Sequence, residues 1–212
     1  MNKKLIIFDL DGTLVNTVKD LNAAINYSLN KNGYPLVSEA HTSKAIGNGI
    51  RITLKRSIPE DVNENVLDKV LSDFRDYYKE HYLDYSLPYE GMVETLLELK
   101  NRGYLLAVAT NKLESIAKDM IEKLYPNIFD IIVGDDLYCP KKPDPFMINK
   151  VLSSLKIQKK DAIYVGDSEV DIESAKNAQV DLLLVDYGFH RSDEYNSLSG
   201  QHIIYPKQLL NL

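Results

Sequence analysis

The feature of this sequence that most restricts its fold is a set of short apolar runs that alternate with helical patterns. The apolar runs are LIIFDL, YLLAVAT, IFDIIVG, AIYVGD and DLLLVDY. Between most of them lie helical patterns such as GMVETLLELKNRG, LESIAKDMIEKLY and DPFMINKVLSSLK. Strands that alternate with helices form right-handed βαβ units and a parallel sheet. Because several runs lack polar alternation, helices should cover both faces of that sheet, so we predict a doubly wound, Rossmann-like α/β core.

The alternation stops after the first apolar run and resumes near the segment SLPYEG, whose proline and glycine mark the return. The intervening sequence reads as helices alone, without a convincing strand: VKDLNAAINYSLNKNG, SEAHTSKAIGN, IRITLKRSI and DVNENVLDKVLSDFRDYYKEHYLD. We therefore predict a core of residues 1–15 and 88–212 with a small all-helical cap, residues 16–87, inserted after the first strand. An insertion at this point is expected to act as a lid over a site.

Composition excludes several classes of function. The formal net charge of −6 over 212 residues, with scattered lysines, gives no general attraction for nucleic acid. No apolar run approaches the roughly 20 residues that span a bilayer, and the N-terminus shows no signal-peptide pattern. The single cysteine, Cys139, has no histidine near it in sequence, which favours an ordinary structural thiol over a nucleophile. We expect a cytoplasmic protein with neither a nucleic acid nor a membrane as partner.

Polar residues follow several of the predicted strands, at the edge of a parallel sheet where ligands bind. They come from four separated segments: Asp9 and Asp11; Thr110, Asn111 and Lys112; Lys141 and Lys142; and Asp167, Ser168 and Asp171. Each has an ordinary explanation by itself, such as a turn, a helix cap or a solvated side chain. Clustered carboxylates, however, repel one another unless a cation or a proton is shared. The pattern as a whole therefore predicts one shared site.

The residue types at this predicted site indicate magnesium and phosphate. The carboxylates of Asp9, Asp11 and Asp167 are hard oxygen ligands that suit Mg²⁺, which commonly works with a phosphate group. The four histidines are isolated from one another in the sequence, so no zinc pattern competes. A threonine hydroxyl and a lysine that face the metal would hold the remaining phosphate oxygens. We predict Mg²⁺ as the cofactor and phosphoryl transfer as the chemistry.

Four motifs occur in the order and with the spacing of a known family. They are DLDGTLVNT at 9–17, ATN at 109–111, KKPDP at 141–145 and GDSEVD at 166–171. With these motifs the chain resembles the haloacid dehalogenase-like hydrolase superfamily, whose first signature reads DxDGT. The helical insertion is similar to the small cap of the phosphoglycolate phosphatase-like subgroup, and IGNGIRITLKRSI at 46–58 resembles its cap segment.

The resemblance implies catalytic roles for both aspartates of the first motif. Asp9 is expected to be the nucleophile that forms an aspartyl-phosphate. Asp11 is expected to be the general acid for the leaving group and then the base that activates water. Since residues i and i+2 of an extended chain lie on the same side, both carboxylates can face one phosphorus atom.

The resemblance also implies the metal ligands. Mg²⁺ is expected to bind the Asp9 carboxylate, the Asp11 main-chain carbonyl and Asp167. Asp171 is expected to act on the metal through water or to orient the site.

Phosphate and substrate contacts follow from the same resemblance. Thr110, Asn111 and Lys142 are expected to bind the phosphoryl group. In the cap, Arg51 is an expected substrate contact, with a role as an ordinary surface helix residue given equal weight.

The predicted function is Mg²⁺-dependent hydrolysis of a small phosphorylated metabolite, with phosphoglycolate as the first substrate, by a monomer or a homodimer. Two alternatives stay open: a sugar-phosphate mutase of the same fold, and a signalling module that resembles a response-regulator receiver domain and keeps its phospho-aspartate. A dehalogenase is disfavoured because family dehalogenases lack the aspartate found here as Asp11. An inactive binding protein is disfavoured because no motif residue has been lost.

Overall fold

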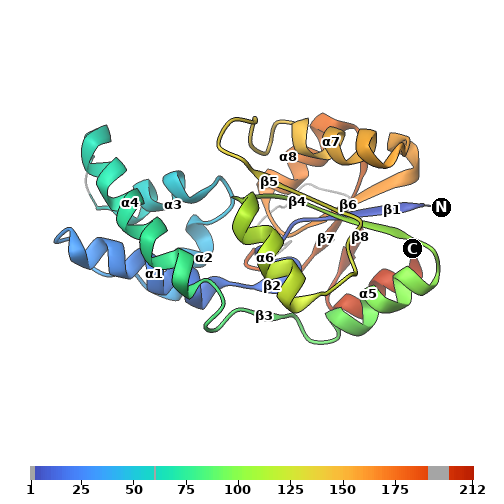
Figure 1. Cartoon of the computed structure of the whole chain (residues 1–212), viewed down its shortest axis with the longest axis horizontal. Helices are drawn as coiled ribbons and strands as arrows, with labels where there is room; N and C mark the ends of the chain where they lie inside the picture. The colour runs from blue at the N-terminus through green and yellow to red at the C-terminus, as the bar shows by residue number, and fades with distance from the viewer. Residues whose placement is uncertain (1–2, 60, 191–200) are drawn as a thin grey trace. The chain divides into compact units, whose positions relative to one another are not determined.

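The computed structural model describes residues 3–59, 61–190 and 201–212, and the chain forms two compact units (Figure 1). The first unit comprises Met1–Asn16 and Pro88–Leu212, and the second comprises Thr17–Leu87. The chain passes between the units through β2 (Val15–Asn16) and β3 (Leu87–Pro88), which pair as a two-stranded sheet. Whether the second unit works as a cap stays a prediction.

The first unit is built on a six-stranded sheet in the order β5-β4-β1-β6-β7-β8, and all neighbouring strands are parallel. The strands are β1 (Leu5–Phe8), β4 (Leu105–Leu113), β5 (Ile131–Asp135), β6 (Ala162–Gly166), β7 (Asp181–Val185) and β8 (Gln201–Ile203). Each residue of β1 is fully buried, as expected for the central strand of a doubly wound sheet. The predicted α/β fold class is confirmed.

Helices cover both faces of this sheet: α5 and α6 lie on one side and α7 and α8 on the other (Figure 1). The helical segments of the unit are α5 (Met92–Asn101), α6 (Glu114–Leu124), α7 (Phe146–Leu155), α8 (Glu169–Ala178) and the 3-10 helices Lys159–Asp161 and Pro206–Asn211. Leu5 and Ile7 of β1 belong to a buried cluster with apolar residues of α7 and α8. Burial of apolar side chains on both faces stabilises the sheet and fixes the strand ends in space.

The sequence prediction missed the end of β4, all of β8 and the two-residue strands β2 and β3. The run YLLAVAT was expected to end at Thr110, but β4 continues to Leu113, with a register shift against β5 between Ala109 and Leu113. The polar residues there give no apolar signal, although Thr110 and Lys112 are buried. The short edge strand β8 was missed because three residues with one buried isoleucine carry too weak a pattern.

The second unit contains the helices α1 (Val18–Lys31), α2 (Glu39–Ala45), α3 (Ile50–Ser57) and α4 (Glu64–His81). Its core lies chiefly between α1 and α4, whose buried apolar residues recur at helical spacing: Leu21, Ala24, Ile25 and Leu29 of α1, and Leu67, Val70, Leu71, Phe74 and Tyr78 of α4. Ser38 and Asn63 cap α2 and α4 by accepting hydrogen bonds from His41 N and Val66 N. Among the residues that the structure describes, no helix has both the length and the apolar composition needed to cross a membrane.

Asp20, in the first turn of α1, ties the beginning of this helical unit to its end. Its buried carboxylate accepts hydrogen bonds from Tyr85 N at 3.0 Å, Ser86 N at 2.8 Å and Ser86 Oγ at 2.6 Å. Hydrogen bonds to a charged acceptor are stronger than neutral ones, and a buried donor left without a partner is costly. The carboxylate therefore holds the residues that lead into β3.

We expect Asp20→Ala to lower the free energy of unfolding by about 2–3 kcal/mol, because buried donors at Ser86 lose their acceptor. Chemical denaturation measures this change. Asp76→Ala, which truncates an exposed aspartate of α4, is the matched control and should shift stability by no more than about 0.5 kcal/mol. Equal effects of the two substitutions would contradict the role given to Asp20.

Candidate active site

The first polar segment turns sharply where β1 ends. Leu14 N and Val15 N both donate to Leu10 O, so the chain folds back directly after Asp9 and Asp11. Gly12 has a φ of +85°, and a Cβ at this position would lie 2.4 Å from Asp167 Oδ2. Only glycine fits this turn, both because of its left-handed backbone and because the Asp167 carboxylate takes the space of a side chain.

Lys142 is a buried cation beside Asp9 and Asp171, with only 2% of its side chain exposed. Its Nζ lies 2.8 Å from Asp9 Oδ1 and donates hydrogen bonds to Asp171 Oδ1 at 2.7 Å and Tyr164 OH at 2.9 Å. Burial by itself would lower the pKa of Lys142, but the negative charges of Asp171 and Asp9 outweigh this effect and raise it. The ammonium therefore stays charged inside the protein.

Asp171 is fully buried at the start of α8 and is the best-satisfied carboxylate of the site. Besides Lys142, it accepts hydrogen bonds from Ser168 N at 3.0 Å, Ser168 Oγ at 2.6 Å and Asp167 N at 3.2 Å. Burial would raise its pKa, but the charge of Lys142 and these hydrogen bonds outweigh burial and lower it. Asp171 thus anchors both Lys142 and the loop after β6.

Asp167 lies in the same buried loop, but among the residues that the structure describes it forms no ion pair. Its Oδ1 accepts from Thr13 Oγ1 at 3.2 Å, and its Oδ2 accepts from Phe189 N at 2.7 Å. Burial is the main cause that raises the pKa of Asp167 well above its usual range, followed by the charges of Asp171 and Asp9. The negative charge of this carboxylate is the least compensated in the cluster.

Asp9, Asp167 and Asp171 come together as the sequence predicted them to meet, with one oxygen from each within 4.8 Å of the others. Burial raises the pKa of Asp9 to about 6, although Lys142 opposes this rise. Its buried Oδ1 contacts Lys142 as an ion pair whose geometry is not that of a hydrogen bond. Buried, repelling hard oxygens of this kind form a donor set that fits a divalent cation.

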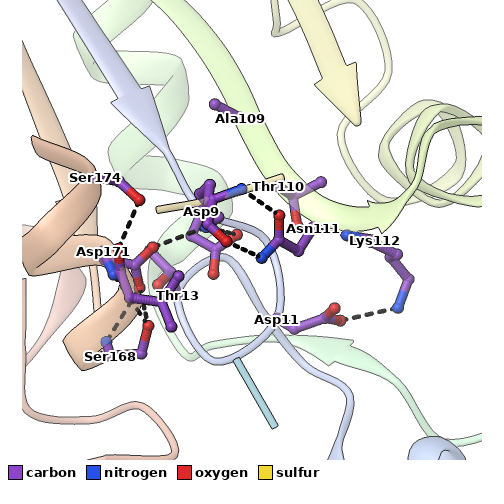
Figure 2. A network of polar contacts seen from close by, with 12 residues as sticks. Asp9, Asp11, Thr13, Ala109, Thr110, Asn111, Lys112, Ser168, Asp171 and Ser174 are labelled. Carbon is purple, nitrogen blue, oxygen red and sulfur yellow. Dashed lines mark hydrogen bonds and ion pairs between the residues drawn. The ribbon is translucent and has the colours of Figure 1, made fainter. Parts of the chain in front are cut away.

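Asp11 does not join this cluster through its side chain. Its Oδ1 accepts a hydrogen bond from Lys112 Nζ at 2.9 Å, and Figure 2 shows this pair to one side of Asp9 and Asp171. Sequence reasoning gave no role to Lys112. The available signal was its position in β4, two residues after Thr110 and therefore on the same side of an extended chain.

The predicted phosphate-binding residues Thr110 and Asn111 directly precede Lys112 in β4. Thr110 is buried, and its Oγ1 accepts from Lys112 N at 3.3 Å. The Asn111 side chain forms two hydrogen bonds with the backbone of Lys142. Its Oδ1 accepts from Lys142 N at 2.8 Å, and its Nδ2 donates to Lys142 O at 3.1 Å. Asn111 thus fixes the loop that carries the buried lysine, and the phosphate contacts of both residues stay predictions.

Arg51, the candidate in the helical unit, is paired within that unit. Its Nη1 lies 2.5 Å from Asp68 Oδ1, and its Nη2 pairs with Glu64. Its side chain is 36% exposed, and the hydrogen bonds and charges of the two acids raise its pKa. The predicted contact of Arg51 with substrate stays a prediction.

Sequence reasoning also missed Tyr164, because an aromatic residue inside an apolar strand looks like core. Its hydroxyl oxygen accepts a hydrogen bond from Lys142. The hydroxyl proton can be donated to Ala109 O or to Asp171 Oδ1, each of which lies 3.0 Å away. Burial, followed by the charges of Asp171 and Asp9, raises the pKa of Tyr164 well above its usual range. Tyr164 is a neutral support for the lysine.

Fold and site together define a Rossmann-like α/β protein with an acidic, lysine-containing site at the carboxyl edge of its sheet. The sequence model of the family described as haloacid dehalogenase-like hydrolase matches residues 6–185, and the chain belongs to this family. The resemblance seen in the motifs is confirmed, and the protein is a hydrolase.

Curated relatives and solved structures agree with this assignment. The chain is 34% identical over 197 residues to a phosphoglycolate phosphatase of Vibrio cholerae, covering 90% of this chain and 87% of the relative. It is 35% identical over 187 residues to a phosphoglycolate phosphatase of Aquifex aeolicus, covering 88% and 86%. The crystal structure of a predicted phosphoglycolate phosphatase from Haemophilus somnus matches with a TM-score of 0.89 at 28% identity, covering 100% of this chain and 98% of the other.

We expect Asp171→Asn to lower the free energy of unfolding by about 3 kcal/mol, because Lys142 then loses a buried counter-ion and the amide cannot accept all of the former hydrogen bonds. Thermal or chemical unfolding measures the loss. Glu173→Gln changes an exposed acid of the same helix and should be nearly neutral. An Asp171→Asn protein as stable as the Glu173→Gln protein would show that Asp171 is not the anchor of the site.

Proposed function

We propose that this protein is a Mg²⁺-dependent phosphatase that hydrolyses a small phosphomonoester through an aspartyl-phosphate on Asp9. The observation that supports the proposal most is the buried cluster of Asp9, Asp167 and Asp171 beside the charged Lys142. Such a site combines acceptors for a divalent cation with a donor for phosphate oxygens. Membership of a hydrolase family and relatives named phosphatases favour water as the final acceptor.

The metal would be held by the carboxylates of Asp9 and Asp167 and by the main-chain carbonyl of Asp11. The raised pKa values of Asp9 and Asp167 express buried negative charge that a cation would neutralise. Bound Mg²⁺ supplies charge neutralisation for the phosphoryl oxygens and a fixed point for their orientation. Asp171 would orient this site without binding the metal directly, because its carboxylate already accepts hydrogen bonds from Lys142 and Ser168.

In the first step, a carboxylate oxygen of Asp9 attacks phosphorus and forms the new bond of an acyl phosphate. The bond between phosphorus and the ester oxygen breaks, and the ester oxygen keeps the electron pair and receives a proton from Asp11. An alcohol leaves. Lys142 and Thr110 would hold the phosphoryl oxygens, and the existing contacts of Lys142 keep its ammonium charged and in place for this task.

In the second step, Asp11 takes a proton from a water molecule, whose oxygen attacks phosphorus. The bond between phosphorus and the Asp9 oxygen breaks, which returns Asp9 as a carboxylate and releases inorganic phosphate. Asp11 thereby regains the proton that it donated in the first step. One aspartate as the nucleophile and a second as the proton carrier complete the hydrolysis.

For the substrate, we propose 2-phosphoglycolate, on the basis of the names of the curated relatives. The helical unit Thr17–Leu87 is then the cap that would select the leaving group, as the insertion after β1 predicts. Arg51 is the proposed cap residue for an anionic leaving group, and binding by Arg51 would compete with its pairing to Glu64 and Asp68.

We expect Asp9→Asn to reduce phosphate release by at least about 10³-fold, because an amide cannot serve as the nucleophile. Release is measured with Mg²⁺ on 2-phosphoglycolate and on a panel of sugar phosphates and other phosphomonoesters. Asp119→Asn, at an exposed ion pair of α6, is the control and should keep full activity. A folded Asp9→Asn enzyme with near-normal turnover would rule out the proposed mechanism, whereas wild-type activity on other esters alone would remove only the named substrate.

Metal removal tests the cofactor separately. An excess of chelator should reduce phosphate release to background, and added Mg²⁺ should restore it, because the carboxylate cluster needs a cation to accept a phosphate dianion. Calorimetric titration of Mg²⁺ into the metal-free protein should show one binding site, which Asp167→Asn should weaken. Activity that persists unchanged in excess chelator would contradict the proposed magnesium site.

A further inference from the structure

Lys112 is a buried lysine of the predicted shared site, and none of the four motifs gives it a role. Its side chain is 4% exposed, and its Nζ donates to Asp11 Oδ1 at 2.9 Å. The Asp11 side chain is itself only 14% exposed. Lysines are rarely buried without a paired charge, because the ammonium loses its hydration. Asp11 therefore supplies a counter-charge for the buried ammonium, and Lys112 in turn holds Oδ1 of Asp11.

An irregularity in β4 brings Lys112 to this point. Ala109 pairs with Val133 and Leu113 pairs with Asp135, so residues 110–112 lie opposite Gly134 alone. A Cβ on Gly134 would lie 2.8 Å from Lys112 O, so the extra residues fit only because this position has no side chain. Bulges of this kind re-aim side chains beside active sites. Thr110 and Lys112, two residues apart in this irregular stretch, are both buried.

The two aspartates of the first motif each have their own lysine. Lys142 contacts Asp9 and Asp171, whereas Lys112 contacts Asp11. Figure 2 shows the Asp11 side chain directed toward Lys112, with Asp9 and Asp171 grouped apart from it. Loss of Lys112 would thus change the setting of Asp11 while the contacts among Asp9, Lys142 and Asp171 stay in place.

We infer that Lys112 is a positioning residue that fixes which oxygen of Asp11 exchanges the proton with the leaving group and with water. A lysine ammonium has donors and no acceptor, so the oxygen it contacts must be an acceptor. When Asp11 carries the proton to be transferred, that proton is therefore on Oδ2, while Oδ1 remains bound to Lys112. The inference rests on the acid and base role given to Asp11 in the proposed function.

The test compares kcat/KM for two substrates that differ in their need for an acid. The leaving alkoxide of 2-phosphoglycolate, or of the alkyl phosphate that the wild-type enzyme hydrolyses fastest, must be protonated, whereas 4-nitrophenolate leaves without a proton. We expect Lys112→Met to lower kcat/KM about 30-fold or more for the alkyl phosphate and no more than about 3-fold for 4-nitrophenyl phosphate. For the alkyl phosphate the loss should fall on kcat, with KM nearly unchanged.

The control for removal of a buried lysine is Lys3→Met. Lys3 is 5% exposed in its side chain, pairs with Asp181 at 2.5 Å and donates to Lys160 O at 2.8 Å, and neither partner is a residue of the site. Any loss that it causes should be equal for both substrates. Circular dichroism and thermal unfolding establish that each variant is folded. Lys112→Gln, which is shorter and neutral but still polar, is measured in the same way and carries the test if Lys112→Met does not fold.

Asp11→Asn separates a failure of this inference from a failure of the proposed function. If Asp11→Asn shows the same dependence on the leaving group, and if adding Lys112→Met to Asp11→Asn causes no further loss for the alkyl phosphate, Lys112 acts through Asp11. An equal loss for both substrates in the Lys112 variants, or no loss at all, would overturn the inference. Absence of any leaving-group dependence in Asp11→Asn would instead overturn the acid role of Asp11 itself.

Discussion

The cluster of Asp9, Asp167 and Asp171 depends on the buried cation Lys142, whose ammonium contacts the carboxylates of Asp9 and Asp171. Asp9 follows β1 and Asp171 lies in the first turn of α8, and their charges would repel each other in a buried space without a shared counter-ion. The loop that carries Lys142 is held by the side-chain amide of Asn111, which donates to Lys142 O and accepts from Lys142 N. Ion pairs and hydrogen bonds around Lys142 thus connect Asp9 after β1, Asn111 of β4 and Asp171 of α8.

The carboxylates of this network have different pKa values because their surroundings differ. Asp171 receives the lysine and several hydrogen bonds, so its pKa is lowered despite complete burial. Asp167 receives only hydrogen bonds and faces two other acids, so burial raises its pKa well above the usual range. An acid whose negative charge is satisfied serves as an anchor, and one whose charge is not satisfied is suited to a cation. Asp167 and Asp171 are only four residues apart, yet the pKa of the first is raised and the pKa of the second is lowered.

Much of this arrangement could be predicted from the sequence, because strand ends in a parallel sheet share one edge and the acids follow those ends directly. The convergence of Asp9, Asp167 and Asp171 is an example. Tertiary contacts could not be read in the same way. β4 continues past Thr110 with a bulge opposite Gly134, and Lys112, which pairs with Asp11, lies in that irregular stretch. Polar residues that are buried by such contacts carry no hydrophobic signal.

The proposed mechanism transfers the phosphoryl group first to Asp9 and then to water, in two displacements at phosphorus. The most direct test is the stereochemical course at phosphorus, measured with a substrate whose phosphoryl group is made chiral with oxygen isotopes and thiophosphate chemistry. Each in-line displacement inverts the configuration, so transfer to Asp9 followed by transfer to water predicts net retention. Net inversion would mean that water attacks the substrate directly, and it would contradict the account.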